Sequence, residues 1–256
     1  MKKLTYTLLL ILCATLCACD DSDTPAPPPT PPVTPSLPKH NIAYNVDGNL
    51  IRAGKEHTGE VLYNIDGAYI RLGDKPSGEI LFNITDNLIR LGDKPTGEVL
   101  FNIDGNYLRA GSTTTGDILF NRDENYIRVG KDSVQRTVFE MSFNSYGGDV
   151  SKGIVETRNN IIYFLYFDSY DGDVSKGIVE TKNNIIYFLD FKSYDRDLLS
   201  GQVRTYNGNI LYFLDFKSYD GDLLSGEVRS RNGTLLYTLY FNSYDGDVSR
   251  GYVELW

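Results

Sequence analysis

Five tyrosines recur at one position of a repeat, and they are the side chains best suited to binding. Each lies in a polar Ser-Tyr-x-x-Asp segment: Tyr146, Tyr170, Tyr194, Tyr219 and Tyr244. Flat aromatic rings with a polar tip suit sugar rings or protein surfaces. Each ring could instead fold back over its own hairpin and shield the core, and this is the arrangement that we expect. If the rings point outward, they form a candidate binding rim for a protein or glycan.

A second recurring side chain is an arginine, found at Arg52, Arg71, Arg90, Arg109 and Arg128. In a closed five-fold ring these would form a circle of guanidinium groups, which is a candidate anion site. An acid follows eight residues after each of the first four: Glu60, Glu79, Glu98 and Asp117. A hairpin would place each acid across from its arginine as a cross-strand ion pair. We expect this pairing, which the fifth copy breaks because it carries Arg136.

The remaining polar groups give little support for catalysis or for a metal site. Asp171-Gly172-Asp173 and related segments offer the clustered oxygens that calcium prefers, but Asp-Gly is also ordinary turn chemistry. The equivalent segments Gly147-Gly148-Asp149 and Asp195-Arg196-Asp197 make such a site irregular. The two histidines, His40 and His57, have no nucleophile placed beside them by a motif. We therefore expect no metal, no cofactor and no enzymatic activity.

Charge and cysteine content narrow the class of partner. The net charge is −9, so nucleic acid is not an expected ligand, because phosphate binding depends on lysine and arginine. The three cysteines, Cys13, Cys17 and Cys19, all precede residue 20. The rest of the chain therefore has neither a disulfide framework nor a thiolate metal site.

A 19-residue repeat organises residues 42–136, and its marker recurs at Asn45, Asn64, Asn83, Asn102 and Asn121. Each copy holds two short apolar runs, such as Tyr69 to Leu72 and Glu79 to Phe82, separated by turn signals such as Asp66-Gly67. Runs this short are typical of hairpin strands. One hairpin cannot bury an apolar face alone, so the copies must share a core. We predict about ten strands that close into a ring, because closure removes open edges.

The repeat resembles the β-flower families in its YN-DG start, its I-R-x-G centre and its G-E-V-L-Y end, from Tyr44 to about Gly130. The resemblance implies short hairpins that close with four-fold or five-fold symmetry, and it brings no established activity.

A second repeat of 24 or 25 residues fills residues 137–256, with Ser145, Ser169, Ser193, Ser218 and Ser243 as markers. Alternate residues of its long strand, such as Tyr187, Leu189 and Phe191, give one apolar face. This pattern predicts a repetitive antiparallel sheet, so the whole chain is predicted to be all-β. The spacing of Tyr170, Gly172 and Gly177 resembles the start of a membrane-occupation-and-recognition-nexus (MORN) repeat. Two modules packed end to end, or one continuous sheet, both fit the sequence.

The N-terminus has the features of an export signal. Lys2 and Lys3 precede a short apolar stretch, and Leu16-Cys17-Ala18-Cys19 resembles the lipobox of bacterial lipoproteins. The resemblance implies that residues 1–18 are a signal peptide and that Cys19 carries a lipid that anchors the chain in a bilayer. The alternative is an ordinary cleaved signal. Residues 19–41 follow as a proline-rich spacer. We expect a cell-envelope lipoprotein of the outer membrane. Whether it faces the periplasm or the outside depends on the bacterial host.

These features together predict a non-catalytic lipoprotein that presents a repetitive β surface to a protein or glycan partner. The alternatives are a purely structural spacer without a ligand and a glycan-active enzyme.

Overall fold

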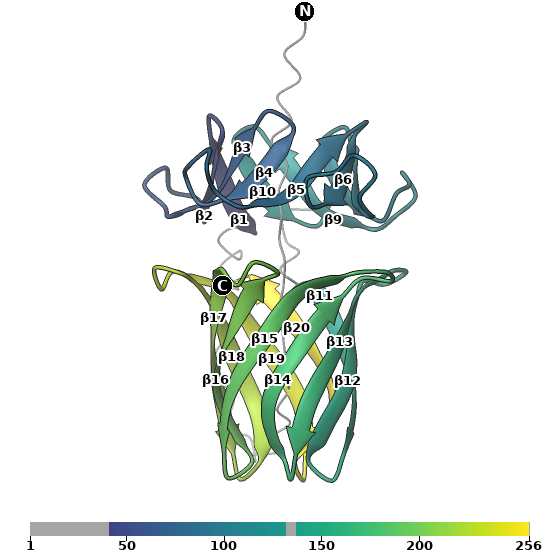
Figure 1. Ribbon diagram of the computed structural model, residues 1–256, viewed down its shortest axis with the longest axis vertical. Helices are drawn as coiled ribbons and strands as arrows, with labels where there is room; N and C mark the ends of the chain where they lie inside the picture. The colour runs from purple at the N-terminus through teal and green to yellow at the C-terminus, as the bar shows by residue number, and fades with distance from the viewer. Residues whose placement is uncertain (1–40, 132–136, 256) are drawn as a thin grey trace, which may run out of the picture.

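The computed structural model describes residues 41–131 and 137–255, and its regular structure there is antiparallel β-sheet. Twenty strands form two closed barrels of ten strands each (Figure 1). The prediction of an all-β fold built from tandem hairpins is thus confirmed. Cys19, the rest of the N-terminal segment and Arg136 lie outside the described residues.

The first barrel, here called the N-terminal ring, contains the 19-residue repeats. Its strands are β1 (Ile42–Asp47), β2 (Leu50–Ala53), β3 (Val61–Asp66), β4 (Tyr69–Leu72), β5 (Ile80–Thr85), β6 (Leu88–Leu91), β7 (Val99–Asp104), β8 (Tyr107–Ala110), β9 (Ile118–Asp123) and β10 (Tyr126–Val129). The ring closes because β1 pairs with both β2 and β10. The predicted five hairpins and the predicted closure are both present.

The second barrel, here called the C-terminal barrel, contains the longer repeats. Its strands are β11 (Thr137–Tyr146), β12 (Asp149–Glu156), β13 (Ile161–Tyr170), β14 (Asp173–Glu180), β15 (Ile185–Tyr194), β16 (Asp197–Thr205), β17 (Ile210–Tyr219), β18 (Asp222–Ser230), β19 (Leu235–Tyr244) and β20 (Asp247–Leu255). The last strand, β20, pairs with β11, so the predicted sheet closes on itself and leaves no open edge.

Alternation along the strands of the N-terminal ring separates its core from its surface. Tyr44 and Val46 face inward and are buried, together with Ile51, which pairs with Val46 on the neighbouring strand. Asn45 and Arg52 pair on the opposite face. The inward isoleucine position recurs as Ile70, Ile89, Leu108 and Ile127, all at most 2% exposed. The repeat thus supplies one side chain per hairpin to each layer of the core.

The interior of the C-terminal barrel is filled in the same layered way. One buried layer contains Phe139, Tyr163, Tyr187, Tyr212 and Tyr237, and another contains Met141, Leu165, Leu189, Leu214 and Leu239. Between them lie the buried valines of the short strands, each paired with a residue of both layers: Val155, Val179, Val203, Val228 and Val253. One glycine per repeat makes room for a phenylalanine on the adjacent strand. A Cβ placed on Gly201, for example, would lie only 2.8 Å from Cδ1 of Phe191.

Candidate functional site

The five candidate tyrosines lie at the turns that join β11 to β12, β13 to β14, β15 to β16, β17 to β18 and β19 to β20. Their side chains are strongly exposed: Tyr146 87%, Tyr170 83%, Tyr194 75%, Tyr219 76% and Tyr244 82%. The expectation that each ring folds back to shield the core is therefore wrong. The turns contain only two residues, and the long strands continue through the tyrosines.

Strand alternation explains why the tyrosines point outward. Tyr146 pairs with Asp149, while the preceding pair, Ser145 with Val150, has Val150 buried inside the barrel. Because neighbouring side chains on a strand point to opposite faces, Tyr146 lies on the outer face. We call these five tyrosines the tyrosine rim.

The turns themselves have the backbone conformation that two-residue hairpins require. Asp171 and Gly172 both have positive φ angles, 52° and 85°, as a type I′ turn demands. In the third copy Asp195 and Arg196 take the same conformation, with φ angles of 53° and 71°. The Asp-Gly sequences are therefore explained by turn geometry.

Neighbouring turns are locked together by a closed circle of hydrogen bonds. The aspartate after each turn accepts a hydrogen bond through Oδ1 from a backbone N–H of the neighbouring turn. The pairs are Gly172 to Asp149 (2.9 Å), Arg196 to Asp173 (3.0 Å), Gly221 to Asp197 (3.1 Å), Gly246 to Asp222 (2.8 Å) and Gly148 to Asp247 (2.9 Å). This circle uses the second carboxylate of each segment that suggested calcium, such as Asp173 in Asp171-Gly172-Asp173. In residues 41–131 and 137–255, no group of three or more histidine, cysteine, aspartate or glutamate side chains is placed to hold a metal ion.

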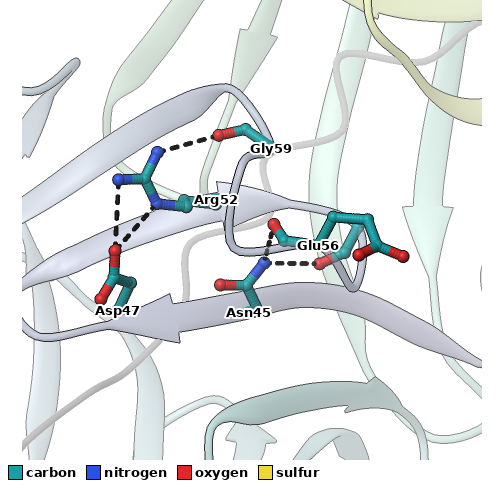
Figure 2. A network of polar contacts seen from close by, with 6 residues as sticks. Asn45, Asp47, Arg52, Glu56 and Gly59 are labelled. Atoms are coloured by element: carbon teal, nitrogen blue, oxygen red, sulfur yellow. Dashed lines mark hydrogen bonds and ion pairs between the residues drawn. The ribbon is translucent and has the colours of Figure 1, made fainter.

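The repeated arginines belong to a different local structure, shown for the first hairpin in Figure 2. Arg52 forms an ion pair with Asp47, at 3.2 Å from Nη2 to Oδ2, and its Nη1 donates to the Gly59 carbonyl at 3.0 Å. Asn45 donates through Nδ2 to the carbonyl of Glu56 at 2.6 Å. These contacts hold the loop after β2 against the outer face of its own hairpin.

The same clamp recurs in the other hairpins and corrects the predicted pairing. The acid that binds each arginine comes five residues earlier, in the pairs Arg71–Asp66, Arg109–Asp104 and Arg128–Asp123. The predicted pairs with Glu60, Glu79, Glu98 and Asp117 do not form. Five residues before Arg90 the chain has Thr85 in place of the aspartate, so Arg90 has no ion pair there. Of the clamp contacts, it forms the hydrogen bond to the Gly97 carbonyl. Since each guanidinium is held on the outside of its own hairpin, the five do not assemble into the candidate anion ring.

The four acids instead join the N-terminal ring to the C-terminal barrel. Glu79 accepts hydrogen bonds from Thr205 Oγ1 at 2.7 Å, from Asn207 Nδ2 at 2.7 Å and from Asn209 Nδ2 at 2.8 Å. These three donors lie at the end of β16 and in the loop after it. Glu60 bonds to Ser230 and Glu98 to Thr181 in the same way, one repeat apart.

Asp117 completes this joint at the loop after β12. It accepts from Thr157 Oγ1 at 2.7 Å and from the backbone N–H and Nδ2 of Asn159 at 2.8 and 2.7 Å. Burial raises the pKa of the Asp117 carboxyl, but the hydrogen bonds from Thr157, Asn159 and Asn160 outweigh it and lower the pKa below its ordinary value. Sequence reasoning missed the joint, although a hydroxyl recurs at the matching position of each barrel repeat: Thr157, Thr181, Thr205 and Ser230.

A buried aromatic layer reinforces the joint. The phenol groups of Tyr44 and Tyr237 are hydrogen-bonded across it, as are those of Tyr63 and Tyr212. Burial, together with neighbouring tyrosines, raises the pKa of Tyr212 well above its usual value, so its phenol stays neutral. The two barrels share one continuous hydrophobic core, and open grooves of about 560 and 730 Å³ flank the joint at Asp117 and Glu79.

Comparison with known proteins supports a β-flower-like repeat in the N-terminal ring. A family model described as "6-fold beta flower protein" matches residues 36–113. The matched segment contains β1 to β8, and the ring in this chain closes with five hairpins. A search of curated proteins finds no match to the chain.

The MORN-like spacing stays a prediction. Within residues 41–131 and 137–255, no helix has the length and apolar character needed to cross a membrane.

Proposed function

We propose that this chain is a non-catalytic cell-envelope lipoprotein that binds a protein or glycan partner through the tyrosine rim. The observation that carries the proposal is the exposure of all five rim tyrosines, 75–87%, at equivalent turns of one barrel. Single exposed apolar side chains are common on protein surfaces, whereas exposed aromatic groups gathered in one region are typical of interaction sites.

The rim is also fixed in place before any partner arrives. The hydrogen bonds between neighbouring turns and the filled barrel interior restrain the backbone that carries the tyrosines. A rigid surface loses less conformational entropy on binding than a flexible one. The rigidity of the rim therefore favours a binding protein over a purely structural spacer.

The order of the segments supports display of the rim away from a membrane. The lipobox-like Leu16-Cys17-Ala18-Cys19 and the proline-rich spacer precede β1, so the N-terminal ring is the part joined to the proposed anchor. The rim lies at the ends of the barrel strands opposite to the loops that contact this ring. An acylated Cys19 in the outer membrane, with the chain facing the periplasm or the outside, would therefore present the rim to a partner at a distance.

The proposal is tested by comparing partner capture by the full chain with capture by two variants. Cell-envelope proteins, peptidoglycan and a glycan array are offered to the wild type, to Tyr170→Ala/Tyr194→Ala/Tyr219→Ala and to Tyr206→Ala. Tyr206 is a matched control because it is 74% exposed but lies in the loop after β16, near the joint. We expect the triple variant alone to lose the partner, without early melting, because exposed side chains contribute little to stability.

Three results would contradict the proposal. Capture that survives the triple substitution would show that another surface binds. Absence of any partner would favour the purely structural spacer, and turnover of a polysaccharide would favour the glycan-active enzyme.

A further inference from the structure

We infer that the partner of the tyrosine rim is a cationic protein segment, rich in lysine or arginine, and not a neutral glycan. This inference rests on the proposed function, because it names the chemistry of the partner for the same five tyrosines.

The charge around the tyrosines is strongly one-sided. The four-residue segments from each rim tyrosine to the aspartate after its turn contain nine aspartates and one basic residue, Arg196. Four of the tyrosines are followed directly by an exposed aspartate: Asp171, Asp195, Asp220 and Asp245. Four of the five turns therefore present an aromatic ring beside a carboxylate.

Among the described residues, only Arg196 forms an ion pair with one of these exposed carboxylates. Asp171 lies 3.6 Å from Arg196, both being largely exposed, which makes a long and solvent-screened ion pair. In the described part of the chain, no ion pair involves Asp195, Asp220 or Asp245. One basic residue per hairpin lies on the outer face two residues further from the turn: Lys152, Lys176, Lys192, Lys217 and Arg250. With Arg196 these are six basic residues against ten aspartates, Asp168 included, so the net charge around the rim stays negative.

An aromatic face beside a carboxylate suits an organic cation. Lysine and arginine side chains are attracted to the face of a tyrosine ring and also form hydrogen bonds with carboxylates. A neutral sugar would use the ring but would gain nothing from the surplus of negative charge. The same negative charge opposes contact between the rims of two copies of this chain, so a second copy does not fit as the partner.

The shape of this end of the barrel also argues against a sugar-binding site. The cavity at this end is lined by turn glycines, including Gly148, Gly172, Gly221 and Gly246, and has a volume of about 30 Å³. That is close to the volume of one water molecule, whereas pockets for small organic ligands have several hundred Å³. The side chain of Arg196 packs against Gly172. Binding must therefore occur on the outer surface of the turns.

The repeat spacing fits an extended basic segment. Neighbouring rim tyrosines are two strands apart, which is about 10 Å in a sheet. An extended chain advances about 3.3 Å per residue, so a basic residue at every third position would reach successive turns. Several such contacts made by one chain reinforce one another, because each contact raises the effective concentration for the next.

The test titrates three labelled probes into the full chain and follows their fluorescence anisotropy. The probes are a (Lys-Gly-Gly)5 peptide, its (Glu-Gly-Gly)5 counterpart and a neutral chitooligosaccharide. The variants are the rim triple Tyr170→Ala/Tyr194→Ala/Tyr219→Ala, the charge triple Asp171→Asn/Asp220→Asn/Asp245→Asn, and Tyr206→Ala as control. Asn-Gly is as good a type I′ turn as Asp-Gly, so the charge triple retains the backbone.

We expect only the lysine peptide to bind, with at least a tenfold loss of affinity in both triples and little change in Tyr206→Ala. No binding of the lysine peptide, or binding that the rim triple leaves unchanged, would overturn the inference. Tyrosine-dependent binding of the saccharide that the charge triple leaves unchanged would also overturn it, while leaving the proposed function intact. The proposed function is tested separately, by whether capture of envelope components depends on the rim tyrosines.

Discussion

Removing one carboxylate from the joint should destabilise the whole chain measurably, and Glu79→Ala is the clearest case. Its carboxylate accepts hydrogen bonds from Thr205, Asn207 and Asn209 at 2.7–2.8 Å. A hydrogen bond to a charged group contributes about 1.5–3 kcal/mol when one partner is buried, as Thr205 is at 2% exposure. Asn207 and Asn209 are exposed, so solvent reduces their contributions to a few tenths of a kcal/mol. The expected loss is therefore about 2–3 kcal/mol in the free energy of unfolding.

Thermal unfolding followed by circular dichroism measures this loss. For a chain of this size about 1 kcal/mol moves the melting temperature by roughly 2–4 °C, so Glu79→Ala should melt about 5–10 °C early. Asp74→Ala is the matched control, because Asp74 is an exposed acid in the preceding loop whose position holds Lys55 and Ser112 in other repeats. It should melt within about 2 °C of wild type. Equal melting temperatures for Glu79→Ala and wild type would refute the assignment of the acids to the joint.

Three further predictions concern the anchor, the barrel core and acid stability. Cys19→Ala should release the chain from membranes with its melting temperature unchanged, and a variant that stays in the membrane pellet would contradict the lipoprotein proposal. Gly201→Ala should lower the free energy of unfolding, measured in urea, by about 1–3 kcal/mol because the new Cβ clashes with Phe191. The double variant Gly201→Ala/Phe191→Leu should recover part of that loss. Losses of stability that simply add in the double variant would contradict this packing. Because the pKa of Asp117 is lowered in the folded chain, its stabilising effect is complete above its ordinary pKa of 3.8 and is lost as pH falls through the folded value. The difference in melting temperature between wild type and Asp117→Asn should therefore shrink from about pH 5 to about pH 2, and a constant difference would contradict this sign.

The hairpins and their core faces were predictable because their causes are local. Asp66-Gly67 specifies a tight turn, and the alternation of Tyr44 with Asn45 separates the inner face from the outer face. The second closure could also have been predicted. The array of longer repeats begins with a long strand, β11, and its last described strand is a short one, β20, so each can pair with the other as a long and a short strand do within one repeat.

The orientation of the tyrosine rim was mispredicted because the long strands were taken to end too early. Ending them at residues such as Phe191 left Tyr194 in a loop, where its direction is undefined. The strand in fact continues to Tyr194, and counting alternate residues from the inward-facing Phe191 places Tyr194 outside.

The partners of the four acids could not be read from local sequence. The bond between Glu60 and Ser230 joins residues 170 positions apart, and it depends on how two separate five-fold arrays face each other. A cross-strand partner within the hairpin was the nearest local choice for Glu60. The loop after β2 excludes it by folding back under the clamp of Asn45 and Arg52.

Photo-crosslinking from the rim in living cells tests the central claim, that the tyrosine rim binds a partner, most directly. A benzophenone amino acid is placed at Tyr219 in the anchored full chain, with the same substitution at Tyr206 as control, and adducts are identified by mass spectrometry. The account predicts one dominant adduct from position 219, with a basic segment at the crosslinked site, and none from position 206. No adduct from position 219, or the same adducts from both positions, would contradict it.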